Sequence, residues 1–178
     1  AGSDRVAPPS AARRAFAAAR PDGSLLAATG FPLASAALGL LLGGGLGVAL
    51  GTLLGLSPRA ARLGFVSVEL LRPVPSVALI PLAMLVFGFG LRMEVSVVAF
   101  ACLWPMAMLT QAAAQQVEPR LLEVARALQM SAWQRFAWIV GPAMVPRLFV
   151  ALRLGVAIAL VVAVTVEIAA NPNGMGYA

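Results

Sequence analysis

Four long apolar runs alternate with shorter polar segments along the chain. The runs cover 31–56, 74–90, 95–114 and 148–170, and nearly all charged residues lie between them. A helix of about 20 apolar residues can cross the hydrocarbon core of a bilayer, although 74–90 is short for this purpose. The pattern therefore predicts an all-α, polytopic helical membrane protein with about four spanning helices.

The composition excludes an ordinary soluble domain. Of the 178 residues, 61% are apolar and 11% are charged, whereas soluble domains contain about 45–50% apolar and about 25% charged residues. The last run still qualifies as a span although Arg153 and Glu167 lie within it. Both residues are near an end of the run, where a charge costs less than at the bilayer centre.

The distribution of arginine indicates the orientation of the chain. The net charge of +6 comes from 13 arginines and no lysine, which would suggest a nucleic-acid partner in a soluble protein but indicates the cytoplasmic side in a membrane protein. Seven of the arginines lie in loops 57–72 and 115–147, so we predict that both loops are cytoplasmic and expect no nucleic acid. The N-terminal segment 1–30, with four arginines, then lies outside the cytoplasm. Four arginines outside the cytoplasm conflict with the positive-inside bias, which favours the interpretation that the chain is a fragment preceded by another span.

The sequence contains no catalytic or metal-binding set. It has no histidine, and its single cysteine, Cys102, lies inside an apolar run. These two facts exclude a disulfide within the chain, a Cys/His metal site and any catalysis that depends on histidine. We therefore expect no cofactor, no metal and no catalytic residue, and the chain is not predicted to be an enzyme.

A glycine occurs at every fourth position through the first run. On a helix this spacing places the glycines along one stripe, where a neighbouring backbone can approach closely and gain van der Waals contact. The string GGGLG at 43–47 resembles a phosphate-binding loop only superficially, since it lacks the lysine and the acidic partner of that motif. The residues assigned to helix packing are Gly39, Gly43, Gly47, Gly51 and Gly55.

The polar stretch 115–147 predicts two short helices joined by a tight turn. Residues 118–128 form an amphipathic pattern, and Ser131 followed by Gln134 is a capping box that starts a second helix. We expect this second helix to end near Gly141-Pro142, and we call the whole helix-turn-helix unit the knob. Its aromatic side chains and arginines suit a groove on a partner, but a simple connector along the membrane interface fits the pattern equally well.

Prolines interrupt the apolar runs, and a few polar groups lie near them. Proline removes a backbone donor and bends a helix, so the freed carbonyls can line a pathway, although prolines are also common in spanning helices without such a role. Glu167 is the only acidic residue expected to be embedded near the outer end of a span, as a gate or as a structural partner, since 91–94 is predicted to be a loop. The candidate gate or pathway residues are Ser76, Pro81, Pro105 and Glu167, with Thr110 and Gln111 as weaker candidates.

Three segments resemble a known family. They are ELLRPVPSVALIPLAMLVFGFG, LEVARALQMSAWQRFAWIVGP and VEIAANPNGMGYA, and they are similar to the permease subunits of bacterial ABC importers, in particular the nitrate/sulfonate/taurine branch. The positions that match the family's cytoplasmic EAA motif are Glu123, Ala125, Ile139 and Pro142. The positions that depart from it are Val124 in place of alanine, Gln129 in place of glycine and Gly141 in place of leucine. Because glycine enters a left-handed turn most easily, the change at Gln129 costs on the order of 1 kcal/mol if the turn is kept.

The resemblance covers about 24–178 and implies a type I importer-permease fold, with one further span before this region and one after it. It implies that the chain moves a small anion such as a sulfonate, taurine or nitrate across the bacterial inner membrane, while ATP is hydrolysed in a partner. The implied partners are ATPase subunits, a second permease copy, an extracytoplasmic substrate-binding protein and membrane lipid. The residues that would dock on the ATPase are Glu123, Ala125, Arg126, Leu128, Gln129, Met130, Ile139 and Pro142.

The competing interpretation is a membrane protein without an ATPase partner, either half of a secondary transporter or a structural helix bundle. A secondary transporter needs ionisable or polar ligands for its coupling ion near the bilayer midplane, and no acidic residue is expected there. An integral-membrane enzyme is less well supported still, because the sequence offers neither a nucleophile with its base nor a set of metal ligands.

Overall fold

The computed structural model describes residues 24–57, 59–64 and 73–170, and all regular structure within them is helical. Most of segment 1–30, part of loop 57–72 and the tail 171–178 lie outside the described residues. The elements in chain order are α2 (Ser24–Gly39), the π-helix η1 (Leu40–Gly44), α3 (Gly45–Leu56), the 3-10 helix η2 (Ser76–Leu79), α5 (Ile80–Phe87), α6 (Leu91–Gln115), α7 (Pro119–Ala127), α8 (Ala132–Arg135), the π-helix η3 (Phe136–Val140) and α9 (Gly141–Ala170). The all-helical prediction is confirmed for this part of the chain.

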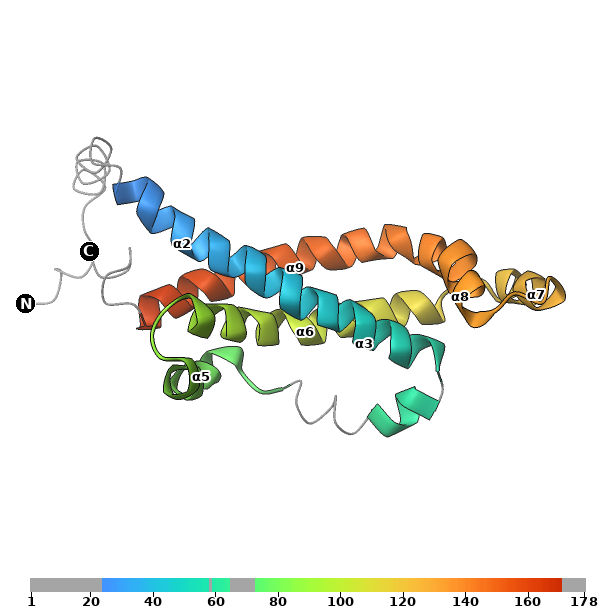
Figure 1. Ribbon diagram of the computed structural model, residues 1–178, viewed down its shortest axis with the longest axis horizontal. Coiled ribbons are helices and arrows are strands. Elements are labelled where there is room, and N and C mark those ends of the chain that lie inside the picture. The colour runs from blue at the N-terminus through green and yellow to red at the C-terminus, as the bar shows by residue number, and fades with distance from the viewer. Residues whose placement is uncertain (1–23, 58, 65–72, 171–178) are drawn as a thin grey trace, which may run out of the picture.

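Three long apolar helices form the body of the molecule. They cover Thr29–Leu56, Leu91–Gln115 and Ala132–Ala170, with 28, 25 and 39 residues, and each exceeds the roughly 20 residues that a bilayer crossing needs. Figure 1 shows them packed side by side along the long axis of the molecule. They coincide with three of the four apolar runs of the sequence.

The second apolar run, 74–90, forms a shorter helix than predicted. Only η2 and α5 are helical there, with four and eight residues, which at 1.5 Å per residue span roughly 18 Å of the about 30 Å hydrocarbon core. The helix ends because Gly88 and Gly90 adopt positive φ angles of 70° and 127°, which residues with a side chain enter only at a cost. Pro81 lies in the first turn of α5, where its missing N–H is not needed.

The helix that contains the last apolar run begins earlier than predicted. α8, η3 and α9 are continuous, so the prediction that the second helix of the knob ends near Gly141-Pro142 is wrong. The wide π-helical turn of η3 lies directly before Pro142, and it shifts the hydrogen-bond pattern at the place where proline offers no donor. The second helix of the knob and the membrane helix are therefore continuous, and we call residues 132–170 the rod.

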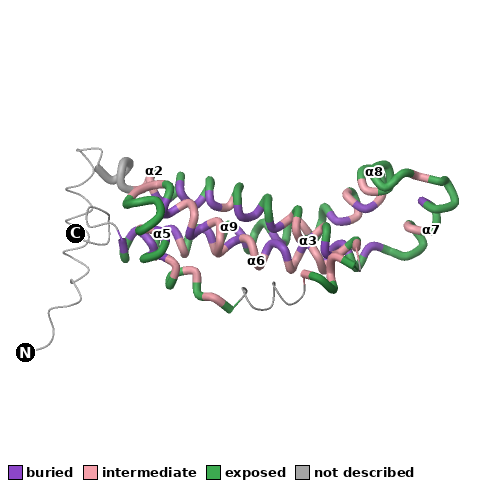
Figure 2. Tube along the Cα trace, turned by 60° about the horizontal axis from the view of Figure 1, so that its bottom comes forward, coloured by how far each residue is buried: buried purple, intermediate pink, exposed green. Residues whose placement is uncertain are grey.

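The central helix of the bundle is α6. It contacts α2, α3, α5 and α9, and its buried side chains include Met93, Val97, Val98 and Cys102. Figure 2 shows buried segments where α6, α9 and α3 face one another and exposed segments on their outer sides. The exposed apolar side chains on those outer sides suit contact with lipid.

The glycine stripe of α2, η1 and α3 lies directly against α6. A Cβ atom built at Gly43 or Gly51 would overlap the backbone carbonyls of Ala99 and Ala107. The other three positions are crowded in the same way: Gly39 by Val98, Gly47 by the Leu103 carbonyl oxygen at 2.6 Å, and Gly55 by the Ala114 Cβ at 2.5 Å. The contact positions advance together along both segments, so α3 and α6 run in the same direction with their backbones in contact.

Candidate functional site

The knob lies at one end of the bundle, beyond the ends of α3 and α6 (Figure 1). Its first helix, α7, begins at Pro119 and packs through Ala125, which is only 1% exposed. Leu122 and Phe136 lie beside the buried cluster that α6 and α9 form around Met144. The knob is therefore held to the bundle by a small apolar base.

The turn between the two helices of the knob keeps the form that glycine favours. Gln129 adopts a left-handed conformation with φ 51°. Its N–H donates to the Arg126 carbonyl at 3.0 Å, and the N–H of Met130 donates to the Ala125 carbonyl at 3.0 Å. This pair of bonds is the Schellman arrangement that closes many helices. The substitution of glycine by Gln129 thus leaves the turn intact, with the strain held in one residue.

The predicted capping box at the start of α8 is confirmed. The Ser131 N–H donates to Gln134 Oε1 at 2.9 Å, and the Gln134 N–H donates to Ser131 Oγ at 3.3 Å. Two backbone donors that the first helical turn leaves open are satisfied in this way. The turn and the cap together fix the angle between α7 and α8.

The outer surface of the knob mixes apolar and charged side chains. Trp133 and Trp138 are 74% and 75% exposed, and Val124 and Leu128 are also exposed. Of the residues predicted to dock on an ATPase, the exposed ones are Glu123, Arg126, Leu128, Gln129 and Pro142, the half-buried ones are Met130 and Ile139, and the buried one is Ala125. Ala125 therefore supports α7 from beneath and does not present its side chain to a partner.

Two acidic residues are buried together at the opposite end of the bundle. Glu167 on α9 is 3% exposed, and Glu94 in the first turn of α6 is 1% exposed. The two carboxyls interact, and Glu94 also faces the Ser35 hydroxyl, which donates to the Pro32 carbonyl at 3.0 Å. The Glu94 Oε2 atom has no hydrogen-bond partner among the described residues.

The interpretation of Glu167 as the only embedded acid is thus wrong. Residues 91–94 were predicted to be a loop, whereas α6 begins at Leu91 and turns Glu94 inward. The sequence did contain a signal: only a few residues separate the second and third apolar runs, so a helix that starts directly after Gly90 must include Glu94.

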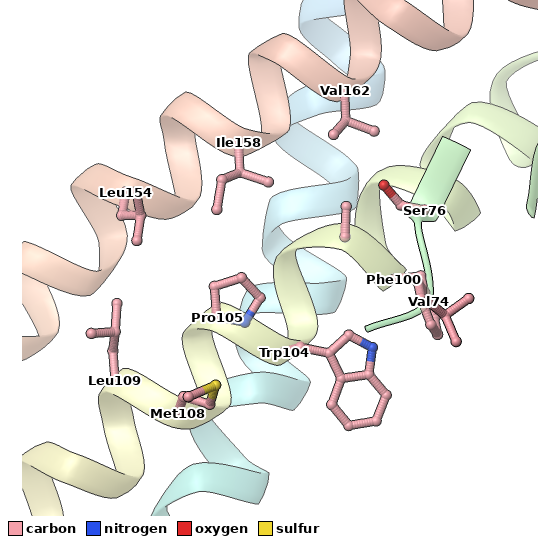
Figure 3. A pocket seen from close by; sticks show the side chains of 11 residues that line it. Val74, Ser76, Phe100, Trp104, Pro105, Met108, Leu109, Leu154, Ile158 and Val162 are labelled. Carbon is pink, nitrogen blue, oxygen red and sulfur yellow. The ribbon is translucent and has the colours of Figure 1, made fainter. Parts of the chain in front are cut away.

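A cavity of about 490 Å³ lies between α6, α9 and the start of η2. Two of the predicted pathway residues, Ser76 and Pro105, line it, together with Phe100 and Trp104 of α6 (Figure 3). Pro81 and Glu167 lie elsewhere, and so do the weaker candidates Thr110 and Gln111. Thr110 is instead buried against Gly51 in the glycine seam.

Trp104 is a cavity residue that the sequence did not single out. Its indole Nε1 is buried and has no hydrogen-bond partner in the described part of the chain, and its ring meets Phe100 edge to face with centroids 5.8 Å apart. The available signal was a tryptophan directly before a proline in the middle of an apolar run. Buried tryptophans normally place their N–H on an acceptor.

Comparison with known proteins gives a consistent result. Residues 43–178 match the family described as binding-protein-dependent transport system inner membrane component. A putative aliphatic sulfonates transport permease of Bacillus subtilis is 35% identical over 80% of this chain and 51% of its own length. A taurine transport system permease of Escherichia coli is 29% identical over 74% and 48% of the two chains. A nitrate import permease of Synechocystis is 30% identical over 82% and 53%. The chain spans about half the length of these curated relatives.

Proposed function

This chain belongs to the family of binding-protein-dependent transport system inner membrane components, the permeases of ABC importers, and on that premise we propose that it is the subunit through which an ATP-driven importer moves a small anion. Membership of this family and the long apolar helices make it a multi-pass protein of the bacterial inner membrane. The anion belongs to the group that includes aliphatic sulfonates, taurine and nitrate, the substrates for which its relatives are named.

The observation that carries the proposal is the continuity of the knob with a membrane helix. Residues 132–170 form a single helix of 39 residues, which changes direction between α9 and α8 (Figure 1) but is nowhere interrupted by a loop. A force applied to the knob is transmitted along this rod, since a helix resists bending far more than a loop does. The rod thus supplies the mechanical link that transport driven by a separate ATPase requires.

The surface of the knob suits the groove of such an ATPase. Tryptophan and arginine are enriched among the residues that dominate the binding energy of protein interfaces, and both types are exposed on the knob. We assign the direct contacts to Glu123, Arg126, Leu128, Gln129 and Met130. Ala125 positions α7 from beneath, and Ile139 and Pro142 lie where η3 continues into α9.

Transport follows from movement of the rods. Two copies of the chain face each other, with their knobs on the cytoplasmic side and a substrate-binding protein on the other side. ATP binding closes the ATPase pair and draws the two knobs together, so the helices rock between outward-facing and inward-facing states. Chemical bonds break only in the ATPase, while this chain binds and moves the anion.

The proposal is tested by cross-linking in the assembled importer. A cysteine in place of Leu128, which is 63% exposed on the knob, should cross-link to cysteines along the groove of the ATPase subunit. A cysteine in place of Leu41, which is 72% exposed on η1, is the matched control and should not react with the ATPase. If no knob position cross-links to any ATPase cysteine, the proposed mechanism is wrong.

One observation favours the alternative of a secondary transporter, namely that Glu94 and Glu167 are both buried at one end of the bundle. The pair lies in the first turn of α6 and near the end of α9, whereas coupling ions bind near the bilayer midplane. Uptake that persists when the ATPase subunit is removed but collapses with the proton gradient would favour this alternative. Uptake that depends on ATP in the absence of a gradient would exclude it.

A further inference from the structure

The cavity beside α6 has mostly apolar walls, and none of the described residues that line it is charged. Figure 3 shows Leu154, Ile158 and Val162 of α9 on one side and Pro105 and Trp104 of α6 on the other. Its volume of about 490 Å³ lies within the roughly 300–1,000 Å³ range of sites for organic molecules. An inorganic oxyanion alone would leave most of these apolar walls without a partner.

Two hydrogen-bond donors interrupt the apolar lining. The Trp104 Nε1–H is buried with no acceptor among the described residues, and the Ser76 hydroxyl is turned toward the cavity, as Figure 3 shows. Ser76 belongs to η2 and Trp104 to α6. A buried donor without a partner is costly, so an oxygen of a ligand would be bound where the protein itself provides none.

From these observations we infer that the cavity is a passage site for an alkanesulfonate, an inference that rests on the proposed importer function. The sulfonate oxygens accept hydrogen bonds from Trp104 and Ser76, and the alkyl tail packs on Leu154 and Ile158. None of the described lining residues offers a carboxylate that could balance an ammonium group, which disfavours taurine. The apolar walls disfavour nitrate, which has no tail to place on them.

The absence of a cation among the described lining residues fits a site through which the substrate passes. A fixed arginine would hold the anion strongly, whereas conduction needs binding that is weak enough to release. Two neutral donors orient the anion without retaining it. The site therefore selects by tail length and shape more than by charge.

The test uses the complete importer in proteoliposomes, with the binding protein saturated so that turnover reports the permease step. The substrates are methanesulfonate and butanesulfonate, with nitrate and taurine as competitors for selectivity. Ile158→Phe should reduce turnover of butanesulfonate about tenfold and leave methanesulfonate within about twofold, because a pocket that is too small discriminates between tails of different length. Ile168→Phe on the exposed face of the same helix is the matched control and should change neither rate.

A second pair of variants tests the donors. Trp104→Phe keeps an aromatic ring but removes the N–H, and Ser76→Ala removes the hydroxyl; each should slow both sulfonates about tenfold. Ser96→Ala is the control, since the Ser96 hydroxyl donates to the Met93 carbonyl at 2.7 Å and lies outside this cavity. If Trp104→Phe assembles poorly, Ser76→Ala and the tail-length series still decide the question.

The outcomes separate the two levels of the proposal. An importer that moves sulfonates with the same tail preference in Ile158→Phe overturns the inference alone, and lipid filling the cavity would give this result. An importer that moves nitrate or taurine but no alkanesulfonate also overturns it, and leaves the importer function standing. A chain whose assembly moves no anion at all contradicts the proposed function itself.

Discussion

The two faces of α6 differ in how closely their neighbours approach. Toward α3 the glycine stripe brings the two backbones into contact and leaves no room for a Cβ at Gly43 or Gly51. Toward α9 there is a cavity of about 490 Å³, and the contact beside it includes a weak bond from Cys102 Sγ to the Gly155 carbonyl at 3.7 Å.

α9 also packs on α6 through buried residues such as Ala159 and Ala163, but the cavity beside this contact leaves room for side chains to rearrange, whereas the interlocked glycine stripe has one arrangement. We therefore expect α3 and α6 to move as one unit and α9 to move relative to them. This division agrees with the position of the knob. Its second helix continues directly into α9, whereas its contact with α6 is a small apolar cluster.

The largest effect is expected from deleting Val145, an exposed residue of α9 beyond the π-helical turn. In a regular α-helix one residue fewer rotates the segment before it by about 100° relative to the segment after it. ATP-driven uptake should fall to background while the rest of the bundle still assembles, because the knob no longer faces in its original direction. Val145→Ala keeps the length of the helix and should transport normally. Normal uptake by the deletion variant would show that α9 does not transmit the motion.

A large side chain introduced into the glycine stripe should cause a large loss of stability. Gly51→Leu forces a side chain against the Ala107 carbonyl and should lower the free energy of unfolding in detergent by about 3 kcal/mol. Gly45→Ala is the control on the same helix, since nothing lies within 4 Å of its added Cβ, and it should be neutral or stabilising by up to about 1 kcal/mol. Equal effects of the two substitutions would mean that α3 and α6 are not interlocked.

The sequence predicted the local features of this molecule better than its long-range ones. The capping box of Ser131 and the left-handed turn at Gln129 depend on residues a few positions apart, and both are present. The short helix 76–87 and the inward orientation of Glu94 depend on where α6 begins and on what α9 places beside it. The cavity was invisible for the same reason, because Trp104 and Ile158 meet only when α6 packs on α9.

A smaller effect is expected at the end of the bundle where α6 and α9 carry Glu94 and Glu167. Glu94→Gln keeps the size of the side chain and its place beside Ser35 while replacing a buried carboxyl with a neutral amide. The free energy of unfolding should stay the same or rise by about 1 kcal/mol, since a carboxyl is costlier to bury than an amide of the same size.

The same measurement on Glu167→Gln tests the gate. Unchanged uptake and assembly in both variants would leave neither residue with a special role in gating or folding. A loss of several-fold in uptake with normal assembly would instead assign the pair to the outer gate. Loss of assembly in Glu94→Gln would contradict the expectation, because it would show that a carboxyl is needed to join α6 to α9.

The smallest effect is expected in the knob, far from both faces of α6. Gln129→Gly relieves a left-handed conformation that costs about 1–2 kcal/mol, but it also raises the entropy of the unfolded chain by about 0.4–1 kcal/mol, so α7 should gain roughly 0.5 kcal/mol. Hydrogen exchange should slow at the amide of Met130, which donates across this turn, and should not change in α3 or α6. A change in hydrogen exchange along the glycine stripe would show that the knob is coupled to α3 and α6, the helices that we expect to move as one unit. The different packing of the two faces of α6 would then not explain which helix moves.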